Sequence, residues 1–326
     1  MKSKQAYPLM KKHFTFSTGE HIEADLKDLQ RLLRDNQQYY ENYQDVLGSL
    51  EDDDYVARGN GFCDRKYSDD FIEGQLEKYA QRVKEIQRWI RDVAVFSVSE
   101  HKKVRFSNGN LQFSPSKRMW RFAEHQYDCI GENNKFMGKS SDGWIDLFGW
   151  GTGDNPENVS TIPTDYSQFN DWGEHLDGSW HTLTLEEWEY LIAKRPNATK
   201  KCGLAQVAGI NGLVLLPDDY ILPDDIVFNS GVASGFGSEL FKTINDFSAQ
   251  QFAEMETYGV VFLPAGGYRH AYGMFRVNCS GYYWSSSSDP CNNRVGFLHF
   301  HQSGIVTDTD TNRVEGHSVR LVTEVN

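Results

Sequence analysis

The sequence has fewer basic than acidic residues, no long apolar run and no paired cysteine motif. Its 33 Lys and Arg are outnumbered by 46 Asp and Glu, which gives a net charge of −13. Because phosphates and anionic lipids are bound by clustered positive charge, we expect no nucleic-acid partner and no docking on an anionic membrane surface. Since no apolar stretch reaches the length of a transmembrane helix, we also expect no membrane insertion.

The cysteines fit neither a disulfide framework nor a zinc ribbon. Their number, 5, is odd, and no two are spaced as C-x-x-C. Free thiols made in a reducing compartment are the plainer interpretation. The cysteines are Cys63, Cys129, Cys202, Cys279 and Cys291.

Residues 1–20 carry charge but lack the apolar core of a secretory signal. We therefore expect a chain that is made in the cytoplasm and then stays there or leaves by a route that needs no signal. Incorporation into the tail of a phage virion, released by lysis, is one such route. Display on a bacterial cell surface, after a signal has been trimmed, is the alternative localisation.

Aromatic residues and glycine are abundant. The 8 Trp, 16 Tyr, 20 Phe and 28 Gly favour many short strands with tight turns, or a binding surface rich in rings. The 326 residues leave room for two domains, each large enough to bury a core.

Apolar residues between positions 22 and 50 recur at steps of four and three, with Asn36 in the one polar slot. This heptad pattern predicts a coiled-coil seam, in which a lone buried Asn fixes register or strand number. The same pattern fits an amphipathic helix packed on its own domain, and the sequence leaves both interpretations open. The apolar positions are Ile22, Leu26, Leu29, Leu33, Tyr40, Tyr43, Leu47 and Leu50.

A second helical pattern follows a polar connector at residues 51–68. Two such helices would form a hairpin, or a bundle with other copies of the chain. We predict that residues 1–93 form a helical module that oligomerises the chain or attaches it to a larger particle, with a trimer among the candidate states. The second run comprises Ile72, Leu76, Tyr79, Val83, Ile86, Ile90 and Val93.

From Ala94 onward the helical period disappears and short strand patterns replace it. Residues 104–106 and 111–113 flank Asn108-Gly109, which predicts a β-hairpin. Thr184 and Glu187 have the spacing of a capping box and predict a helix start. Further predictions are strands at 213–216, 260–264 and 317–322 and a helix at 249–258.

The segment 297–301 alternates in a way that assigns its faces. If Leu298 and Phe300 point into the core, then Phe297, His299 and His301 share the opposite face of the strand.

Several segments of residues 94–326 resemble the variable proteins of diversity-generating retroelements, in particular those of gut Bacteroidales and their phages. The resemblance is densest from 258 to 322, and nothing in residues 1–93 contributes to it. It rests on Trp180…Leu183-Thr184…Glu187-Trp188, Gly212-Leu213-Val214-Leu215-Leu216-Pro217, Phe262-Leu263-Pro264-Ala265-Gly266-Gly267-Tyr268-Arg269, Tyr283-Trp284-Ser285-Ser286-Ser287 and Gly316-His317-Ser318-Val319-Arg320-Leu321-Val322.

The resemblance implies an α+β chain: a C-type-lectin-like domain of the formylglycine-generating-enzyme subtype at 94–326, after the helical module. In that family a reverse transcriptase alters selected codons, so a fixed scaffold displays changeable side chains that bind varied ligands. We therefore expect a binding protein and not an enzyme, with no cofactor. Phage receptor binding or cell-surface recognition is the expected role, with a protein or glycan on a target cell as ligand.

The variable segment is predicted at about 269–317. It mixes Tyr, Ser, Asn, Asp, His and Phe, which supply ring area and adaptable hydrogen bonding as in antibody paratopes. An ordinary polar loop region is the alternative interpretation. The predicted ligand-binding residues are Tyr272, Tyr282, Ser288, Asp289, Asn292, Asn293, Arg294, Phe297, His299, His301, Thr307, Asp308, Asp310 and Asn312.

A metal-dependent or thiol enzyme on the same scaffold is the alternative function. His299 and His301 would share a strand face, but zinc needs three or four ligands. The run 308–312 has oxygen ligands for calcium, although a solvated turn explains it as well. Cys279 and Cys291 lie close in sequence, but no neighbouring base marks either as a thiolate. No metal site is predicted.

Overall fold

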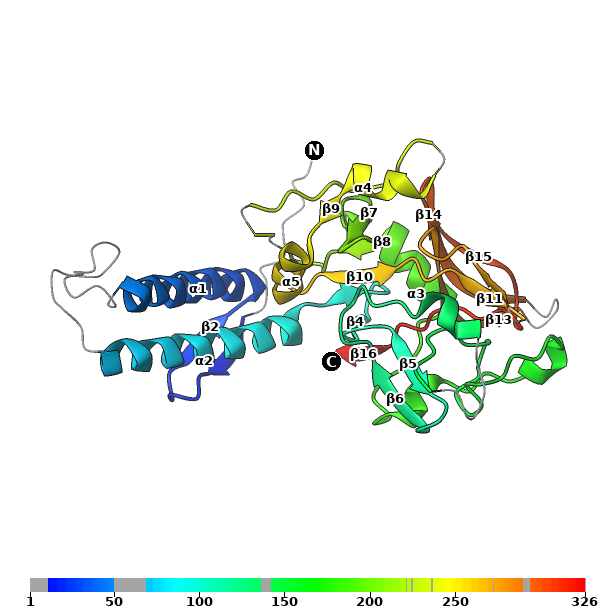
Figure 1. Ribbon diagram of the computed structural model, residues 1–326, viewed down its shortest axis with the longest axis horizontal. Coiled ribbons are helices and arrows are strands. Elements are labelled where there is room, and N and C mark those ends of the chain that lie inside the picture. The colour runs from blue at the N-terminus through cyan, green and yellow to red at the C-terminus, as the bar shows by residue number, and fades with distance from the viewer. Residues whose placement is uncertain are drawn as a thin grey trace. The chain divides into compact units, whose positions relative to one another are not determined.

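The computed structural model describes residues 11–49, 69–135, 142–220, 222–223, 225–235, 237–271, 273–289 and 294–325 (Figure 1). The chain divides into two compact units, one of residues 1–94 with 219–221 and one of residues 95–218 with 222–326. Long helices occupy the first unit, and short strands and helices are mixed in the second. The chain is therefore α+β with an N-terminal helical region, as predicted.

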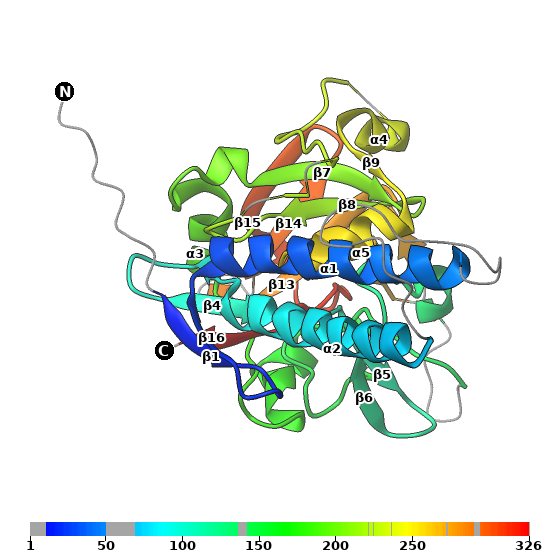
Figure 2. The same ribbon diagram turned by 90° about the vertical axis from the view of Figure 1, so that its left-hand side faces the viewer.

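The first unit is a helical hairpin with a small β-ribbon. Helices α1 (Leu26–Ser49) and α2 (Asp69–Val93) lie side by side and antiparallel (Figures 1 and 2). The rings of Tyr39 and Tyr79 stack with their centres 5.2 Å apart, while Ile72 packs against Val46. Strands β1 (Lys12–Thr15) and β2 (His21–Ala24) precede α1 in the chain and pair with each other. Ile22 therefore belongs to a strand, and its assignment to the helix is wrong.

Asn36 is buried in the hairpin, and its partners lie in the same chain. Its Nδ2 donates to the Leu32 carbonyl at 2.7 Å, and its Oδ1 accepts from Arg82 Nε at 3.0 Å. Arg82 in turn pairs with Glu20. The heptad seam of α1 thus packs against α2 of the same chain, as expected for an amphipathic helix packed on its own domain.

The second unit contains several small sheets. The largest has the order β10-β8-β7-β9, and a three-stranded sheet has the order β13-β14-β15. The remaining pairs are β16-β4-β3, β5-β6 and β11-β12. The strands are β3 (Phe96–Ser97), β4 (Lys103–Phe106), β5 (Leu111–Ser114), β6 (Met119–Phe122), β7 (Cys202–Val207), β8 (Ile210–Leu215), β9 (Asp246–Phe247), β10 (Val261–Pro264), β11 (Tyr268–His270), β12 (Gly273–Phe275), β13 (Ser280–Asp289), β14 (Arg294–His301), β15 (Gly304–Asn312) and β16 (Val322–Val325).

Two helices of the second unit, α3 and α5, begin at capping residues. Thr184 and Glu187 form the predicted capping box of α3 (Leu185–Glu189), which continues as a π-helical turn at Tyr190–Lys194. Ser248 caps α5 (Ala249–Thr257), close to the predicted bounds. Short helical segments complete the unit: Gly131–Lys135, Pro163–Tyr166, Trp172–His175, Ala198–Lys200, Ser238–Leu240 and α4 (Phe241–Ile244).

The hairpin predicted around Asn108-Gly109 is wrong. Strand β4 pairs with β3 and β16, whereas β5 pairs with β6. Neither Asn108 nor Gly109 has the positive φ that a two-residue type I′ turn requires. A Cβ on Gly109 would lie 2.5 Å from the Ala123 carbonyl oxygen, so glycine serves close backbone approach here.

The C-terminal segment 317–322 runs through the middle of the second unit. Its backbone exchanges hydrogen bonds with Phe148, Tyr282, Leu111 and His181, which lie far apart in sequence. All six residues are buried, so the segment has no polar face. The predicted strand is confirmed only in its last residue, Val322, because the partners on either side change from one residue to the next.

Arg320 anchors this segment through a buried polar network. Its guanidinium donates to Gln126 Oε1, to Asn110 Oδ1 at 3.4 Å and to the Phe262 carbonyl at 3.3 Å. Burial lowers the pKa of Arg320 to about 10. Asn110 also donates to the hydroxyl of Tyr283, at 3.1 Å, so the network reaches strand β13.

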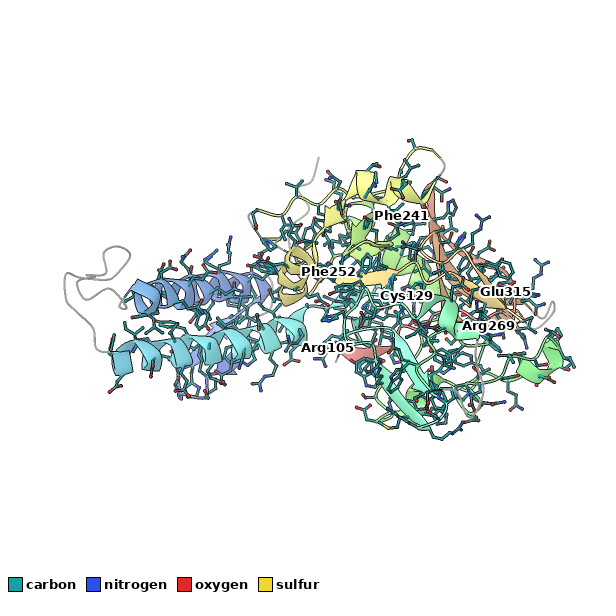
Figure 3. All side chains as sticks on the ribbon, in the orientation of Figure 1. Arg105, Cys129, Phe241, Phe252, Arg269 and Glu315 are labelled. Carbon is teal, nitrogen blue, oxygen red and sulfur yellow. The ribbon has the colours of Figure 1, made fainter. Side chains whose placement is uncertain are left out.

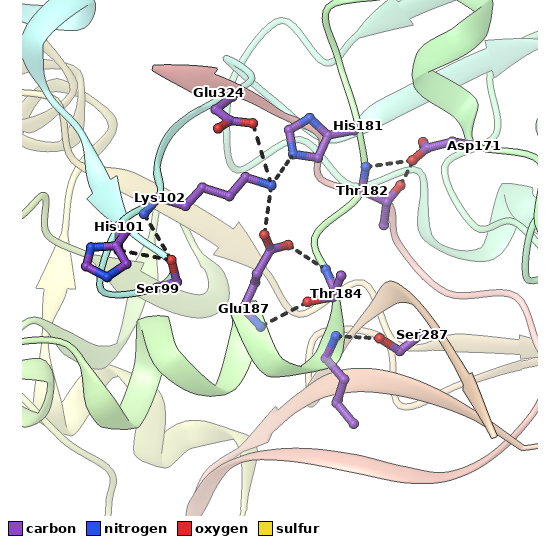
Figure 4. A network of polar contacts seen from close by, with 11 residues as sticks. Ser99, His101, Lys102, Asp171, His181, Thr182, Thr184, Glu187, Ser287 and Glu324 are labelled. Carbon is purple, nitrogen blue, oxygen red and sulfur yellow. Dashed lines mark hydrogen bonds and ion pairs between the residues drawn. The ribbon is translucent and has the colours of Figure 1, made fainter. Parts of the chain in front are cut away.

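A second polar cluster fixes the start of α3 against the β13–β15 sheet (Figure 4). Lys102 Nζ lies 2.8 Å from Glu187 Oε1 and 3.4 Å from His181 Nε2. The Leu185 amide donates to Ser287 Oγ at 3.0 Å, which attaches the helix to β13. This helix supports one face of the sheet.

Candidate ligand-binding site

The two faces of the β13-β14-β15 sheet differ. Tyr283, Leu298 and Phe300 point into the main core with Trp188 of α3. Cross-strand pairing of Tyr282 with His299, and of His299 with Val306, places these three residues on the opposite face. Leu298 and Phe300 thus point into the main core, and Phe297, His299 and His301 share the opposite face, as the alternation of 297–301 predicts.

Part of this opposite face is covered by a second core. Trp284, Val295 and Phe297 pack there with Trp150 and Trp172, and Phe297 is only 6% exposed. The register of β14 is irregular with both of its neighbours. It shifts against β13 between Trp284 and Ser288, and against β15 between Val295 and Phe297. The uncovered part of the face begins beyond Phe297, towards His299 and His301.

Five rings from four strands form a continuous row on the uncovered part, which we call the ring patch: Phe275, Tyr268, Tyr282, His299 and His301. Phe275 stacks on Tyr268 at 5.3 Å, and Tyr268 meets Tyr282 edge-on at 5.1 Å. Tyr282 and His299 stack at 4.4 Å with 14° between their planes, and His301 follows at 5.1 Å. Such contacts hold the rings in fixed orientations.

Buried residues support the ring patch from below. His317 is fully buried, stacks on Trp284 at 3.9 Å and lies 5.2 Å from the Tyr282 ring. Its Nε2 is 3.2 Å from Glu315 Oε2, which also accepts from Thr311. Arg269, labelled with Glu315 in Figure 3, pairs its backbone with Gly316 and fixes β11 to this segment.

Burial disfavours the charged forms of His299 and His317. The pKa of His299 is lowered to about 4, first by burial and then by the neighbouring His301 and His317. Burial likewise lowers the pKa of His317, against the opposing effect of Glu315. The ring patch therefore presents a neutral imidazole at His299.

These shifts predict acid sensitivity of the fold. A base whose pKa is lower in the folded than in the unfolded protein opposes folding as it takes up its proton. The free energy of unfolding should therefore fall as pH falls from about 6.5 towards about 4. Urea unfolding at several pH values measures this slope. His299→Gln should make the slope shallower than that of the wild-type protein, and equal slopes would contradict the assignment of His299.

The structure separates the predicted ligand-binding residues into groups. Tyr282, His299 and His301 lie in the ring patch, and exposed Asp308 lies beside it on β15. Thr307 pairs with Leu298 and therefore faces the core side. Residues Tyr272, Asn292 and Asn293, and the side chains of Asp289 and Asp310, lie outside the described part of the chain.

A polar group lies at the other end of β14. Arg294 and Asn312 are exposed and pair across strands, and exposed Ser288 pairs with Val295. Five residues of strand, about 17 Å, separate Arg294 from His299. The predicted residues thus make two surfaces, with buried Phe297 between them.

Sequence reasoning missed two members of the uncovered face, Tyr268 and Val306. Tyr268 belongs to the Gly266-Gly267-Tyr268-Arg269 segment that looked like scaffold, yet its ring joins Phe275 and Tyr282. Val306 is 45% exposed and sits opposite His299. Once β15 is placed, alternation along it predicts that Val306 lies on this face. No local pattern in residues 268–275 predicts the contact of Tyr268 with β13.

The candidate metal ligands and thiols of the described part of the chain form neither a metal-binding group nor an activated thiol. Among them, no group of three or more His, Cys, Asp and Glu could hold a metal ion. Cys279 is half-buried, and Cys291 lies outside the described residues. Burial raises the pKa of the Cys129 thiol to about 12 and also raises that of Cys202.

Comparison of the chain with protein-family models, with curated proteins and with solved structures finds no match. Within the described ranges, none of the helices combines the length and apolar composition needed to cross a bilayer.

Proposed function

We propose that this chain is a ligand-recognition protein that displays exchangeable side chains on a C-type-lectin-like scaffold. The observation that carries the proposal is that buried core residues and residues of the ring patch lie next to each other along β13 and β14. Tyr283 and Trp284 are buried and hydrogen-bonded to backbone carbonyls of Pro264 and Phe148. Their neighbour Tyr282 and the facing His299 instead form the ring patch.

This alternation supports a diversified surface because it separates two kinds of residue. Tyr282 and His299 lie outside the main core, although Tyr282 packs against the second core, whereas Leu298 and Phe300 belong to the main core. The pattern is that of binding residues carried on a rigid sheet. The setting we favour is a phage tail or a bacterial surface, with a protein or glycan on a target cell as the ligand.

Association of several copies through the N-terminal hairpin would add avidity to individually modest sites. The exposed parts of α1 and α2 are the faces available for it, since their seam is used within the chain.

Sequencing of the locus tests the proposal directly. We expect an adenine-rich near-copy of the segment encoding 268–322 beside a reverse-transcriptase gene. Its mismatches should fall on codons for Tyr282, His299, His301 and Asp308, and should spare those for Trp284 and Leu298. Mismatches spread evenly over buried and exposed positions, or the lack of any such copy, would count against the proposal.

A further inference from the structure

A polar pocket in the second unit lies outside the ring patch. Its volume is about 190 Å³, and the described residues that line it all come from the segment 150–170. This segment precedes the variable segment predicted at about 269–317. The lining of the pocket would therefore stay constant while residues of the variable segment change.

Backbone contacts hold the walls of the pocket in place. The Gly153 amide donates to the Asn170 carbonyl, and the Asn170 amide donates to the Gly151 carbonyl, each at 3.1 Å. Gly151 has a φ of +64°, and a Cβ on it would lie 2.7 Å from the carbonyl oxygen of Gln168. Glycine thus permits the close approach of two loops, so the pocket is formed without a ligand.

Two buried rings, Trp150 and Tyr166, form the floor of the pocket. Trp150 Nε1 donates to the Ser285 carbonyl at 3.0 Å, which fixes the indole. The Arg313 guanidinium lies 4.8 Å from the centre of the Trp150 ring and donates to the Tyr166 carbonyl at 3.3 Å. Because Arg313 follows the exposed Asn312, the pocket adjoins the polar end of β14 and β15.

Amide side chains dominate the polar lining. Within the described residues, no hydrogen bond engages the side chains of Asn155, Gln168 or Asn170. Asn158 also lines the pocket, and its Oδ1 accepts from the Ser160 amide at 3.0 Å. Each amide side chain carries two N–H donors and an acceptor oxygen. Such a lining suits a ligand whose groups both donate and accept hydrogen bonds.

The charges at the pocket favour a neutral ligand. Its two carboxylates are engaged, since Asp154 pairs with His175 at 3.0 Å and Asp165 accepts from the Ser160 hydroxyl. No Lys, Arg or His is among the described lining residues, so an anion would meet carboxylates without a cation. Within the described chain, no group of three or more His, Cys, Asp and Glu could hold a metal ion.

We propose that this pocket binds one unit of a neutral saccharide. Sugar hydroxyls donate and accept hydrogen bonds, which matches the amides of Asn155, Gln168 and Asn170. The pocket is a constant site beside Arg294 and Asn312, which belong to the variable segment. Because it is separate from the ring patch, failure of this inference would leave the proposed function standing.

Indole N–H resonances of the full chain test the inference. Trp150 lines the pocket, whereas Trp188 lies in the main core with its Nε1 bonded to the Trp284 carbonyl, so the pair gives a signal and an internal control. The neutral probes are methyl α-mannopyranoside, methyl β-galactopyranoside and N-acetylglucosamine. At least one should shift the Trp150 resonance saturably and leave that of Trp188 in place. Glucuronate and calcium chloride at the same concentrations should shift neither.

Variants then assign the shift to the amides. Asn155→Ala combined with Gln168→Ala should weaken binding of the neutral sugar about tenfold, because hydrogen bonds to two side chains are lost. Gln250→Ala removes an exposed amide of α5 that does not line the pocket, and should change binding less than about twofold. An unchanged Trp188 resonance shows that each variant is folded.

The outcomes that overturn the inference are distinct. No shift of Trp150 with any of the neutral sugars would exclude a saccharide site. A larger shift with glucuronate or with calcium chloride would identify an anion or a cation site instead. Unchanged sugar binding by the double variant would show that the amides do not contact the ligand.

Discussion

Replacing Arg320 by alanine should lower the free energy of unfolding by about 3–5 kcal/mol. Arg320 is buried and donates to Gln126, Asn110 and the Phe262 carbonyl. Its removal takes this donor from Asn110 Oδ1 and the Phe262 carbonyl, whereas Gln126 Oε1 still accepts from the Phe262 amide at 2.9 Å. Each group that stays unpaired costs about 1–3 kcal/mol, and the substitution also opens a cavity. Removal of an uncompensated buried charge offsets part of this loss. Urea unfolding at neutral pH measures the change.

Lys194→Ala is the control for Arg320→Ala. The Lys194 side chain is 53% exposed and pairs with Glu189, which is 43% exposed, so its loss should cost less than about 1 kcal/mol. Similar effects of the two substitutions would show that the Arg320 network does not hold the second unit together.

Replacing Gly267 by alanine should destabilise the protein by about 2–4 kcal/mol and displace the edge of the ring patch. Gly267 has a φ of +70°, and a Cβ there would lie 2.2 Å from the carbonyl oxygen of Phe275. The positive φ alone costs about 1 kcal/mol for an L residue, and the backbone clash adds to it. Because the clash is with β12, Phe275 must move relative to Tyr268.

Gly178→Ala separates these two contributions. Gly178 has a φ of +77°, but a Cβ there meets nothing within 4 Å. It should therefore show the conformational cost of about 1 kcal/mol without the clash. Thermal unfolding of both variants gives the comparison. Equal losses of stability would mean that β12 moves freely, and that Phe275 is not held in the ring patch.

Local sequence patterns predicted helices α3 and α5 of the second unit, because the signals of such helices are local. Thr184 and Glu187 satisfy each other's backbone within one turn, so the start of α3 could be read from four residues. The burial of Leu298 and Phe300 followed from alternation in the same way. Alternation also fixes the face of His299 and His301, although it does not tell how much of that face is covered.

The remaining errors have long-range causes. Residues 104–106 and 111–113 look like a hairpin, but each pairs with strands or segments that the local sequence does not reveal. By alternation Phe297 lies on the face opposite the main core and was expected to be exposed. A second core, whose residues come from widely separated parts of the chain, covers it. The ring patch joins β11 and β12 to β13 through Tyr268, a contact that depends on tertiary packing alone.

The most direct test of the central claim is the fraction of folded members in two variant libraries. One library randomises the surface positions Tyr282, His299, His301, Val306 and Asp308, and the other randomises Tyr283, Trp284, Ser285, Leu298 and Phe300. Protease resistance of displayed variants measures folding in both. A scaffold with an exchangeable face predicts that most members of the first library fold and few of the second do. Equal intolerance in the two libraries would contradict it, because the ring patch would then be part of the core.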